Sequence, residues 1–197
     1  MSLPDLFART RQPLRPQIPP ADMMALPGSG MTLNFIMQQQ RPSNWCWAAV
    51  ATSLVHHYHS NSTLTQCALV NRQFSLGDCC VNNTSLKCNR PASLNTVLSS
   101  LGALARLVSS PSSFADVRAQ ITNNRPLACR ITWPGGSVVG HFVVVFGHST
   151  DFSGPAPVNW VAVADPLYHG SEMPYLKFLT RYQNKVTTWT HSYFTQP

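Results

Sequence analysis

The chain has 197 residues, of which 44% are hydrophobic and 11% are charged, so it is long enough for one globular domain with a sizeable core. No run approaches the eighteen or so consecutive apolar residues of a membrane span, and we expect no membrane partner. The formal charge of +7 comes without a block of Lys or Arg or an interleaved aromatic stripe, which argues against a nucleic-acid surface.

The N-terminal stretch differs in composition from the rest of the chain. Residues 1–33 have no sustained apolar periodicity, and their prolines and arginines are Pro4, Pro13, Pro16, Pro19, Pro20, Pro27, Arg9, Arg11 and Arg15. Such a composition is typical of a flexible arm, here preceding a domain at 34–197. A propeptide-like lid and a docking tail are the alternatives. The stretch lacks the continuous apolar segment of a secretory signal.

The first predicted helix begins at a cysteine. A polar turn broken by Pro42 ends at Cys46, and apolar residues at helical spacing follow as far as Tyr58. Ser43 or Asn44 is the candidate N-cap. Amide groups of a first helical turn stabilise negative charge, so Cys46 is favoured as a thiolate, the nucleophilic form. The alternative is a buried cysteine that acts only as a small hydrophobe.

Gln40 lies six positions before Cys46. Its side-chain amide and the Cys46 backbone amide form the outline of an oxyanion hole above the thiol. A nucleophilic cysteine also needs a base, and the candidates lie about a hundred residues further along the chain.

In the middle of the chain, the sequence predicts helices first and extended strands after them. Capping signals at Ser93 and at the Ser113-Asp116 box mark two of the helices. The predicted helices are 64–74, 94–101 and 114–122; the predicted strands are 126–133, 141–148, 158–165 and 185–194, with a turn at 134–136 and a further helix at 175–182. Helices followed by antiparallel strands indicate an α+β fold.

The strands at 141–148 and 158–165 are joined by a turn-rich segment and should form a hairpin. With the turn centred near Ser153, His141 comes opposite Asp165. Directly opposed side chains have Cβ atoms roughly 4.5–5.5 Å apart, so the carboxylate could hold the imidazole in one tautomer. A register slip of one residue would separate the two side chains. Asp151 is the rival acid, but it falls in the predicted turn, far from His141.

These residues resemble a known family. The patterns Gln-x5-Cys-Trp-Ala-Ala, Thr65-Gln66-Cys67, Asp78-Cys79-Cys80, Gly140-His141-Phe142-Val143-Val144 and Val163-Ala164-Asp165-Pro166 are similar to those of the bacterial branch of papain-like cysteine peptidases, which includes plant-pathogen avirulence proteases and relatives of bacteriocin-leader peptidases. The resemblance covers residues 35–195. The pair Arg41-Pro42 departs from the family pattern within the active-site turn.

The resemblance implies a papain-like two-lobed α+β fold, with an N-terminal helical lobe that carries the cysteine and a C-terminal antiparallel β lobe that carries His and Asp. It implies Cys46 as nucleophile, His141 as base, Asp165 as orienting acid and Gln40 as oxyanion-hole donor. The implied activity is that of an endopeptidase acting on particular proteins, as bacterial effectors and toxins do. An acyltransferase or glutamine deamidase on the same triad stays open, and so does a non-catalytic binding module.

We expect no cofactor. The partners we expect are a protein substrate and an immunity or inhibitor protein that blocks the cleft. Without an export signal in the arm, we expect the chain to be delivered by a secretion system or as part of a larger toxin, and to act in the cytoplasm of the target cell.

The remaining cysteines are Cys67, Cys79, Cys80, Cys88 and Cys129. One or two disulfides are expected, with Cys67 bonded to Cys79 or Cys80; the connectivity cannot be read from the sequence. The spacing does not reproduce two Cys-x2-Cys knuckles, which argues against structural zinc. His56 and His59 have the i, i+3 spacing of metal ligands, but no acid or cysteine follows at useful spacing, so we predict no metal site.

Overall fold

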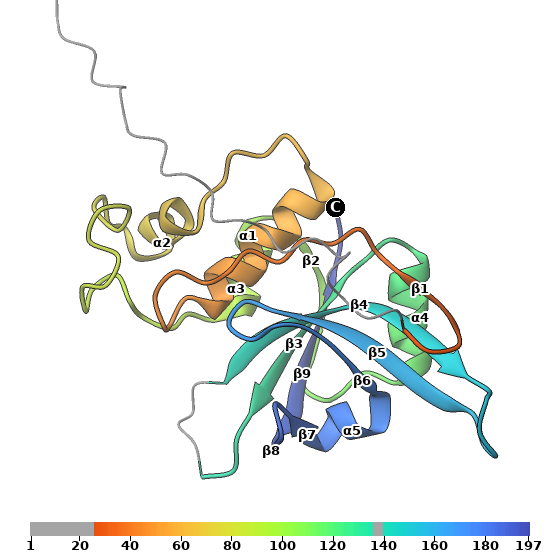
Figure 1. Ribbon diagram of the computed structural model, residues 1–197. Coiled ribbons are helices and arrows are strands. Elements are labelled where there is room, and N and C mark those ends of the chain that lie inside the picture. Colours follow the sequence, from red (N-terminus) through yellow and green to blue (C-terminus); the bar gives the residue numbers. More distant parts are fainter. Residues whose placement is uncertain (1–25, 136–139) are drawn as a thin grey trace, which may run out of the picture.

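The computed structural model describes residues 26–135 and 140–197, which form a mixed helical and antiparallel β structure (Figure 1). The helices are α1 Cys46–Tyr58, α2 Gln66–Phe74, α3 Leu94–Ser100, α4 Phe114–Thr122 and α5 Tyr175–Thr180. The strands are β1 Ser29–Thr32, β2 Leu104–Val108, β3 Leu127–Thr132, β4 His141–Asp151, β5 Val158–Asp165, β6 His169–Pro174, β7 Arg181–Tyr182, β8 Lys185–Val186 and β9 Thr188–Thr195. Within the described ranges, none of the helices is both long and apolar enough to cross a bilayer.

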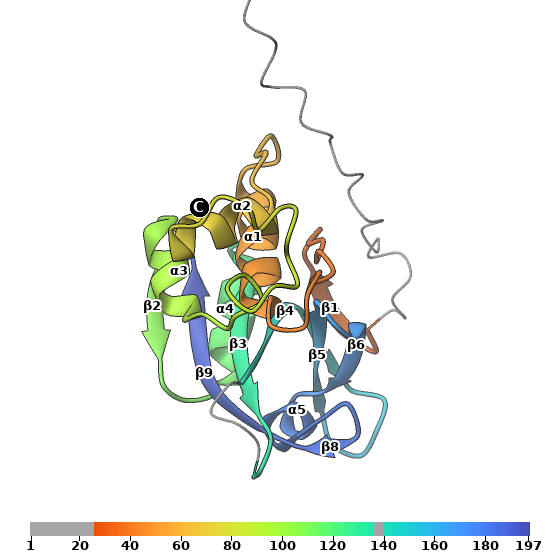
Figure 2. The same ribbon diagram turned by 90° about the vertical axis from the view of Figure 1, so that its left-hand side faces the viewer.

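Most strands join one antiparallel sheet in the order β2-β9-β3-β4-β5-β6. β4 is the central and longest strand. Its first half pairs with β3, its second half pairs with the short strand β1, and β5 lies along its other edge. β7 and β8 form a separate two-stranded ribbon. Figure 2 shows the helices α1, α2 and α3 gathered towards one end of the strands.

The end of the predicted arm belongs to the sheet. β1 pairs with residues 147–150 of β4, and the backbones approach so closely that a Cβ at Gly30 would collide with the carbonyl oxygen of His148. A Cβ at Gly147 would lie 2.6 Å from Thr32 Cγ2. Residues 29–32, which the prediction assigned to the arm, thus form a strand of the sheet; these four exposed residues show none of the apolar periodicity on which the prediction relied. Residues 1–25 of the arm lie outside the described residues.

The predicted hairpin is present as β4 and β5, but its register differs from the prediction. Val144 pairs with Ala164, two residues away from the register that places His141 opposite Asp165. A β-bulge between Val145 and Gly147 causes a further shift along the ladder. On the His141 side of the bulge, a shift of two residues keeps the side chains on their predicted face, because side chains alternate with a period of two.

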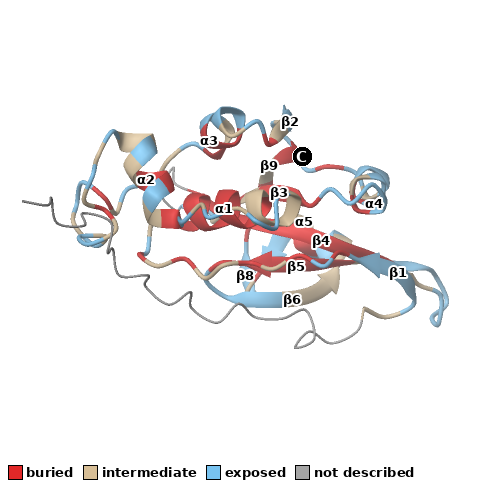
Figure 3. Ribbon diagram, turned by 90° about the horizontal axis from the view of Figure 1, so that it is seen from above, coloured by how far each residue is buried: buried red, intermediate tan, exposed pale blue. Residues whose placement is uncertain are grey.

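The core lies between α1 and the central strands. α1 packs against β4 and against α2 and α3, while α4 also packs on β4. In Figure 3 the buried residues run continuously along α1, β4 and β5, and β1 and β6 are more exposed. Trp47, Val50, Ala51 and Leu54, four residues of the predicted apolar stripe, are completely buried. Residues 46–54 are buried on every face of the helix, so the buried surface of α1 is wider than the predicted stripe.

The element predictions were mostly confirmed, with boundaries shifted by up to three residues. The predicted helix 175–182 is shorter, since its last residues form β7, and the predicted closing strand is divided into β8 and β9. The strands β1, β2 and β6 were not predicted. β6 contains His169, Gly170 and Pro174, which are poor strand formers, and it is held by pairing with β5. The predicted turn at 134–136 extends outside the described residues.

Candidate active site

The two free cysteines differ in their surroundings. Cys67, Cys79, Cys80 and Cys88 are paired in disulfides, which leaves Cys46 and Cys129 as free thiols. Cys129 lies within β3, and complete burial raises its thiol pKa well above the usual value. Cys46 is the first residue of α1 and lines a pocket. The geometry therefore makes Cys46 the candidate nucleophile.

The turn before Cys46 is held by the segment 88–90 rather than by the predicted caps. The N-cap residue of α1 is Trp45, and no side chain caps the helix. The Nε1 of Trp45 donates to the carbonyl of Cys88 (2.8 Å), and the Nε1 of Trp47 donates to the carbonyl of Arg90 (3.0 Å). Both indoles are buried, so each bond satisfies a donor that burial would otherwise penalise.

Asn89 adds a second set of contacts to the same turn. Its Oδ1 accepts from the backbone amide of Asn44 (3.0 Å), and its backbone carbonyl accepts from the Asn44 side-chain amide (3.0 Å). Its own Nδ2 donates to the Ser43 hydroxyl (3.2 Å). The two residues predicted as caps thus serve to join the active-site turn to the segment 88–90.

Two disulfides fix the segment that supports the turn. Cys67 in α2 is bonded to Cys80, and Cys79 is bonded to Cys88. The first bond is one of the two pairings predicted for Cys67; the second was not predicted. Because Cys88 precedes Asn89 directly, the Cys79–Cys88 bond anchors the residues that contact Asn44 and Trp45.

The structure brings His141 and Asp165 together. His141 opens β4 and Asp165 closes β5, and the imidazole Nε2 lies 2.8 Å from Asp165 Oδ1. A carboxylate only accepts hydrogen bonds, so Nε2 carries the proton in this pair. Asp151 is half-buried at the far end of β4, where its carboxylate accepts the Ser153 amide. Ten residues of extended strand, roughly 33 Å, separate Asp151 from His141.

Asp165 is completely buried and accepts four hydrogen bonds. Oδ1 accepts from His141 and from the backbone amides of Leu167 (2.7 Å) and Tyr168 (3.0 Å). Oδ2 accepts from the hydroxyl of Tyr182 (2.9 Å). A buried carboxylate is tolerated only with such compensation, because the loss of hydration otherwise disfavours its charge.

The imidazole of His141 is set up to carry a proton. Burial by itself lowers its pKa, but hydrogen bonds to Asp165 and to Cys46, together with their charges, raise the pKa to about 9. Nδ1 is left for the contact with the thiol, since Nε2 is committed to Asp165. A neighbouring thiol and a readily protonated imidazole are the components of a thiolate-imidazolium pair.

Gln40 is buried beside the active-site turn, but its amide is engaged there. Nε2 donates to the carbonyls of Pro42 (3.2 Å) and Ser43 (2.7 Å), and Oε1 is buried without a hydrogen-bond partner among the described residues. The Gln40 backbone amide donates to the carbonyl of Pro166 (2.9 Å), next to Asp165. Gln40 therefore links the turn before the thiol with the end of β5.

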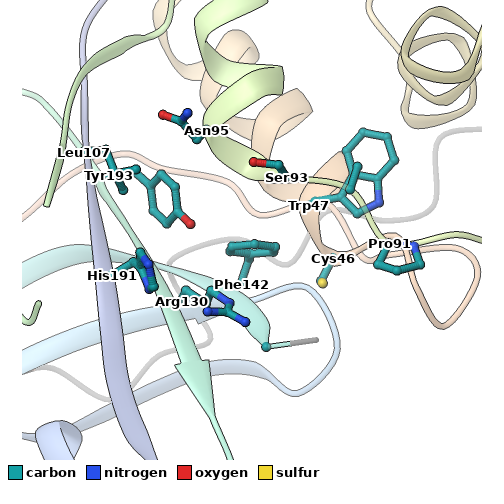
Figure 4. Close-up of a pocket in the computed structure, with 12 residues that line it drawn as sticks. Cys46, Trp47, Pro91, Ser93, Asn95, Leu107, Arg130, Phe142, His191 and Tyr193 are labelled. Atoms are coloured by element: carbon teal, nitrogen blue, oxygen red, sulfur yellow. The ribbon is translucent and has the colours of Figure 1, made fainter. Parts of the chain in front are cut away.

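A pocket of about 450 Å³ opens beside Cys46. Trp47 and the segment 91–95 line one side, and residues of β2, β3, β4 and β9 line the other. Figure 4 shows Phe142 between Cys46 and Tyr193, with Arg130 nearby. A pocket with aromatic walls next to a thiol can hold a substrate side chain close to the bond under attack.

One cluster of potential metal ligands exists in the described ranges, formed by Asp78, Cys79 and Cys88. The two sulfurs are bonded to each other, so neither can act as a thiolate ligand. Asp78 instead forms an exposed ion pair with Lys87. His56, considered above as a metal ligand, contacts Gln38 and the carbonyl of Leu64.

Three residues near the site were missed by the sequence analysis: Gln66, Asn89 and Tyr182. The side chain of Gln66 donates to the Gln39 carbonyl and accepts the Arg41 amide, so it holds the segment that leads to the turn. Gln66 stands in the Thr65-Gln66-Cys67 pattern, from which no role was predicted for it. Asn89 and Tyr182 belong to no motif and are recognised only by what lies beside them in space.

A comparison with known families matches most of the chain. The family model described as papain-like cysteine protease AvrRpt2 matches residues 29–184. The match begins at the first residue of β1 and includes Gln40, Cys46, His141 and Asp165. A search of the curated proteins finds no significant match.

Proposed function

From the premise that the chain belongs to the family of the papain-like cysteine protease AvrRpt2, we propose that it hydrolyses peptide bonds of specific target proteins through a triad of Cys46, His141 and Asp165. The observation that carries this proposal is the buried contact between His141 and Asp165, beside a thiol, Cys46, that contributes to the raised pKa of the imidazole. The family match makes the chain a papain-like cysteine protease. The triad is our proposal for the side chains that carry out the reaction.

In this mechanism the Cys46 thiolate attacks the carbonyl carbon of the scissile peptide bond. The electron pair of the carbonyl moves to oxygen, and the tetrahedral oxyanion forms beside the first-turn amides of α1. Protonated His141 then gives its Nδ1 proton to the leaving amine, and the C–N bond breaks. Water, deprotonated by neutral His141, attacks the thioester and releases the carboxylate and the thiol.

The Cys46 backbone amide and Gln40 are the proposed oxyanion donors. Gln40 Nε2 donates to the carbonyls of Pro42 and Ser43. One of these two hydrogen bonds must therefore break when substrate binds, so that the freed N–H can point at the oxyanion. The Oε1 of Gln40 has no partner among the described residues, which leaves that end of the amide free of any bond that would resist rotation. Removal of one oxyanion donor costs about 10²–10³-fold in turnover in other proteases.

The biological role that we propose is that of a bacterial effector or toxin that is delivered into a target cell. Membership of a family described by an avirulence protease supports this role. The two disulfides also suit a chain that passes through an oxidising compartment. An inhibitor or immunity protein that covers Cys46 and the adjoining pocket would protect the producing cell.

The test compares two cysteine variants. Cys46→Ala should abolish cleavage, whereas Cys129→Ala, the matched change at the second free thiol, should retain it. Proteome-wide labelling of new N-termini after expression of each variant identifies targets and detects cleavage. Cleavage by Cys46→Ala with a normal circular-dichroism spectrum would overturn the proposal. A change in intact substrate mass without new N-termini would instead indicate deamidation or acyl transfer.

A further inference from the structure

Tyr182 places a hydroxyl group against the one oxygen of Asp165 that His141 does not use. The Tyr182 hydroxyl donates to Asp165 Oδ2 at 2.9 Å, and both side chains are buried. Three donors converge on Oδ1, namely the His141 ring and two backbone amides. In the described part of the chain, Tyr182 is the hydrogen-bond partner recorded for Oδ2.

This arrangement controls the plane of the carboxylate. Rotation about the Cβ–Cγ bond of Asp165 moves both carboxylate oxygens, so the bonds at Oδ1 and the bond at Oδ2 resist it together. The bond from Tyr182 to Oδ2 therefore adds a second anchor point, which helps to keep Oδ1 directed at the Nε2 of His141. It also stabilises the ionised form of a carboxyl group that has lost its hydration.

The residue that makes this contact lies on a strand outside the main sheet. Tyr182 lies on β7, which pairs only with β8 in a two-residue hairpin outside the main sheet. The turn residues Gln183 and Asn184 both have positive φ (49° and 58°), the conformation of a tight hairpin turn. The Tyr182 ring is also packed edge-on against the completely buried Phe178 at 5.8 Å. The hairpin turn and the packing on Phe178 therefore hold the Tyr182 hydroxyl in place.

Tyr182 can act only as a donor to this carboxylate. Burial, and then the nearby charge of Asp165, raise the Tyr182 pKa above its usual value. The hydroxyl stays protonated over the range in which His141, with a pKa of about 9, changes its charge. The bond to Oδ2 thus persists through the catalytic cycle.

We propose that Tyr182 is a positioning residue of the catalytic unit, which orients Asp165 and, through it, His141. This inference rests on the proposed function, because orientation of the acid matters only if His141 works as the proton donor and acceptor. It adds to the triad a fourth side chain that touches neither substrate nor nucleophile.

The first experiment removes a single oxygen atom. Tyr182→Phe keeps the ring and its packing on Phe178, and we expect kcat to fall about tenfold, the scale of one hydrogen bond to a charged group, with KM within about twofold of wild type. Tyr58→Phe is the matched control, because its hydroxyl also makes one side-chain hydrogen bond, to Thr195, at the far end of α1. The control should retain wild-type kcat.

The second experiment repeats the change in an Asp165→Ala protein. If Tyr182 acts through Asp165, removal of its hydroxyl there should have no further effect on kcat. The same tenfold loss in that background would show a general structural role and overturn the proposal, as would unchanged kcat of Tyr182→Phe in the wild-type background. Cys46→Ala, assayed in parallel, separates the two claims: if it remains active, the proposed function fails whatever Tyr182 does.

Discussion

The two sides of the candidate site are held in place by different means. His141 and Asp165 lie at the ends of β4 and β5, adjacent strands in the middle of the main sheet. Cys46 lies at the start of a helix whose preceding turn is supported by the irregular segment 88–90. The His–Asp pair is therefore positioned by a hydrogen-bonded strand ladder, and the thiol is positioned by side-chain contacts and disulfides.

This difference has energetic consequences. His141 pairs with Ile131 of β3, and Asp165 pairs with His169 of β6, so displacement of either residue disturbs a strand ladder. The segment 88–90 has no such ladder, and each of its bonds to the turn contributes only about 1 kcal/mol. A disulfide that closes a short loop typically contributes about 2–4 kcal/mol. We infer that covalent bonds replace secondary structure on the thiol side.

The largest expected effect comes from the sheet side. Asp165→Ala removes the group that fixes the His141 tautomer and supports its positive charge, and turnover should fall about 100-fold, within the usual range for acid-base groups. Asp165→Asn should lose less, because an amide oxygen can still accept from Nε2. Asp151→Ala should be nearly silent. Equal losses at positions 151 and 165 at pH 7 would contradict the assignment of the orienting acid.

A smaller effect is expected from the disulfide side. The double variant Cys79→Ala/Cys88→Ala should lose about 2–4 kcal/mol in free energy of unfolding and about tenfold in turnover, because Asn89 and Cys88 would no longer hold the active-site turn firmly. Urea unfolding and steady-state kinetics measure the two losses.

The second disulfide provides the matched control. Cys67→Ala/Cys80→Ala should lose comparable stability but less turnover, since Cys80 is further along the chain from Asn89 than Cys88 is. If both pairs lose turnover in proportion to stability, the segment 88–90 has no special role in placing the thiol.

The comparison also explains which features could be predicted from the sequence. The α1 stripe and the hairpin strands follow from periodicity, which directly encodes which face is buried. The face shared by His141 and Asp165 was predicted correctly even though the register was two residues away, because a shift of two preserves the alternation. The bulge at 145–147 that changes the ladder leaves no sequence signal of its own except Gly147.

The supporting contacts could not be predicted in the same way. Cys79 and Cys80 are adjacent in sequence, yet they bond to different partners, Cys88 and Cys67. Asn89 and Tyr182 act through partners 45 and 17 residues away. Such contacts depend on how irregular segments fold back on the core, which periodicity does not describe. β1 was assigned to the arm because its four residues are exposed and show no apolar periodicity.

The smallest expected effect is a shift in pH dependence, which tests the sheet side alone. The contacts of His141 with Asp165 and Cys46 raise its pKa to about 9, so kcat/KM should decline as pH rises through about 9, where the leaving amine loses its proton donor. Asp165→Asn should move this decline to lower pH, since the acid's charge is removed. The Cys79→Ala/Cys88→Ala variant should move the decline less than Asp165→Asn does, because its contact between His141 and Asp165 is intact.

The same pKa predicts a stability effect of defined sign. Folded His141 binds its proton more tightly than the unfolded chain, whose reference pKa is 6.5. Its contribution to stability is therefore fully present below about pH 6.5 and is lost as pH rises through about 9, to a total of about 3 kcal/mol at most. Urea unfolding of wild type and His141→Gln at intervals between pH 6 and 10 measures the free energy of unfolding of both proteins. The difference between the two isolates the contribution of His141, because the other titrating groups are common to both. If the two proteins lose stability in parallel over this range, the imidazole is not held in its charged form by Asp165.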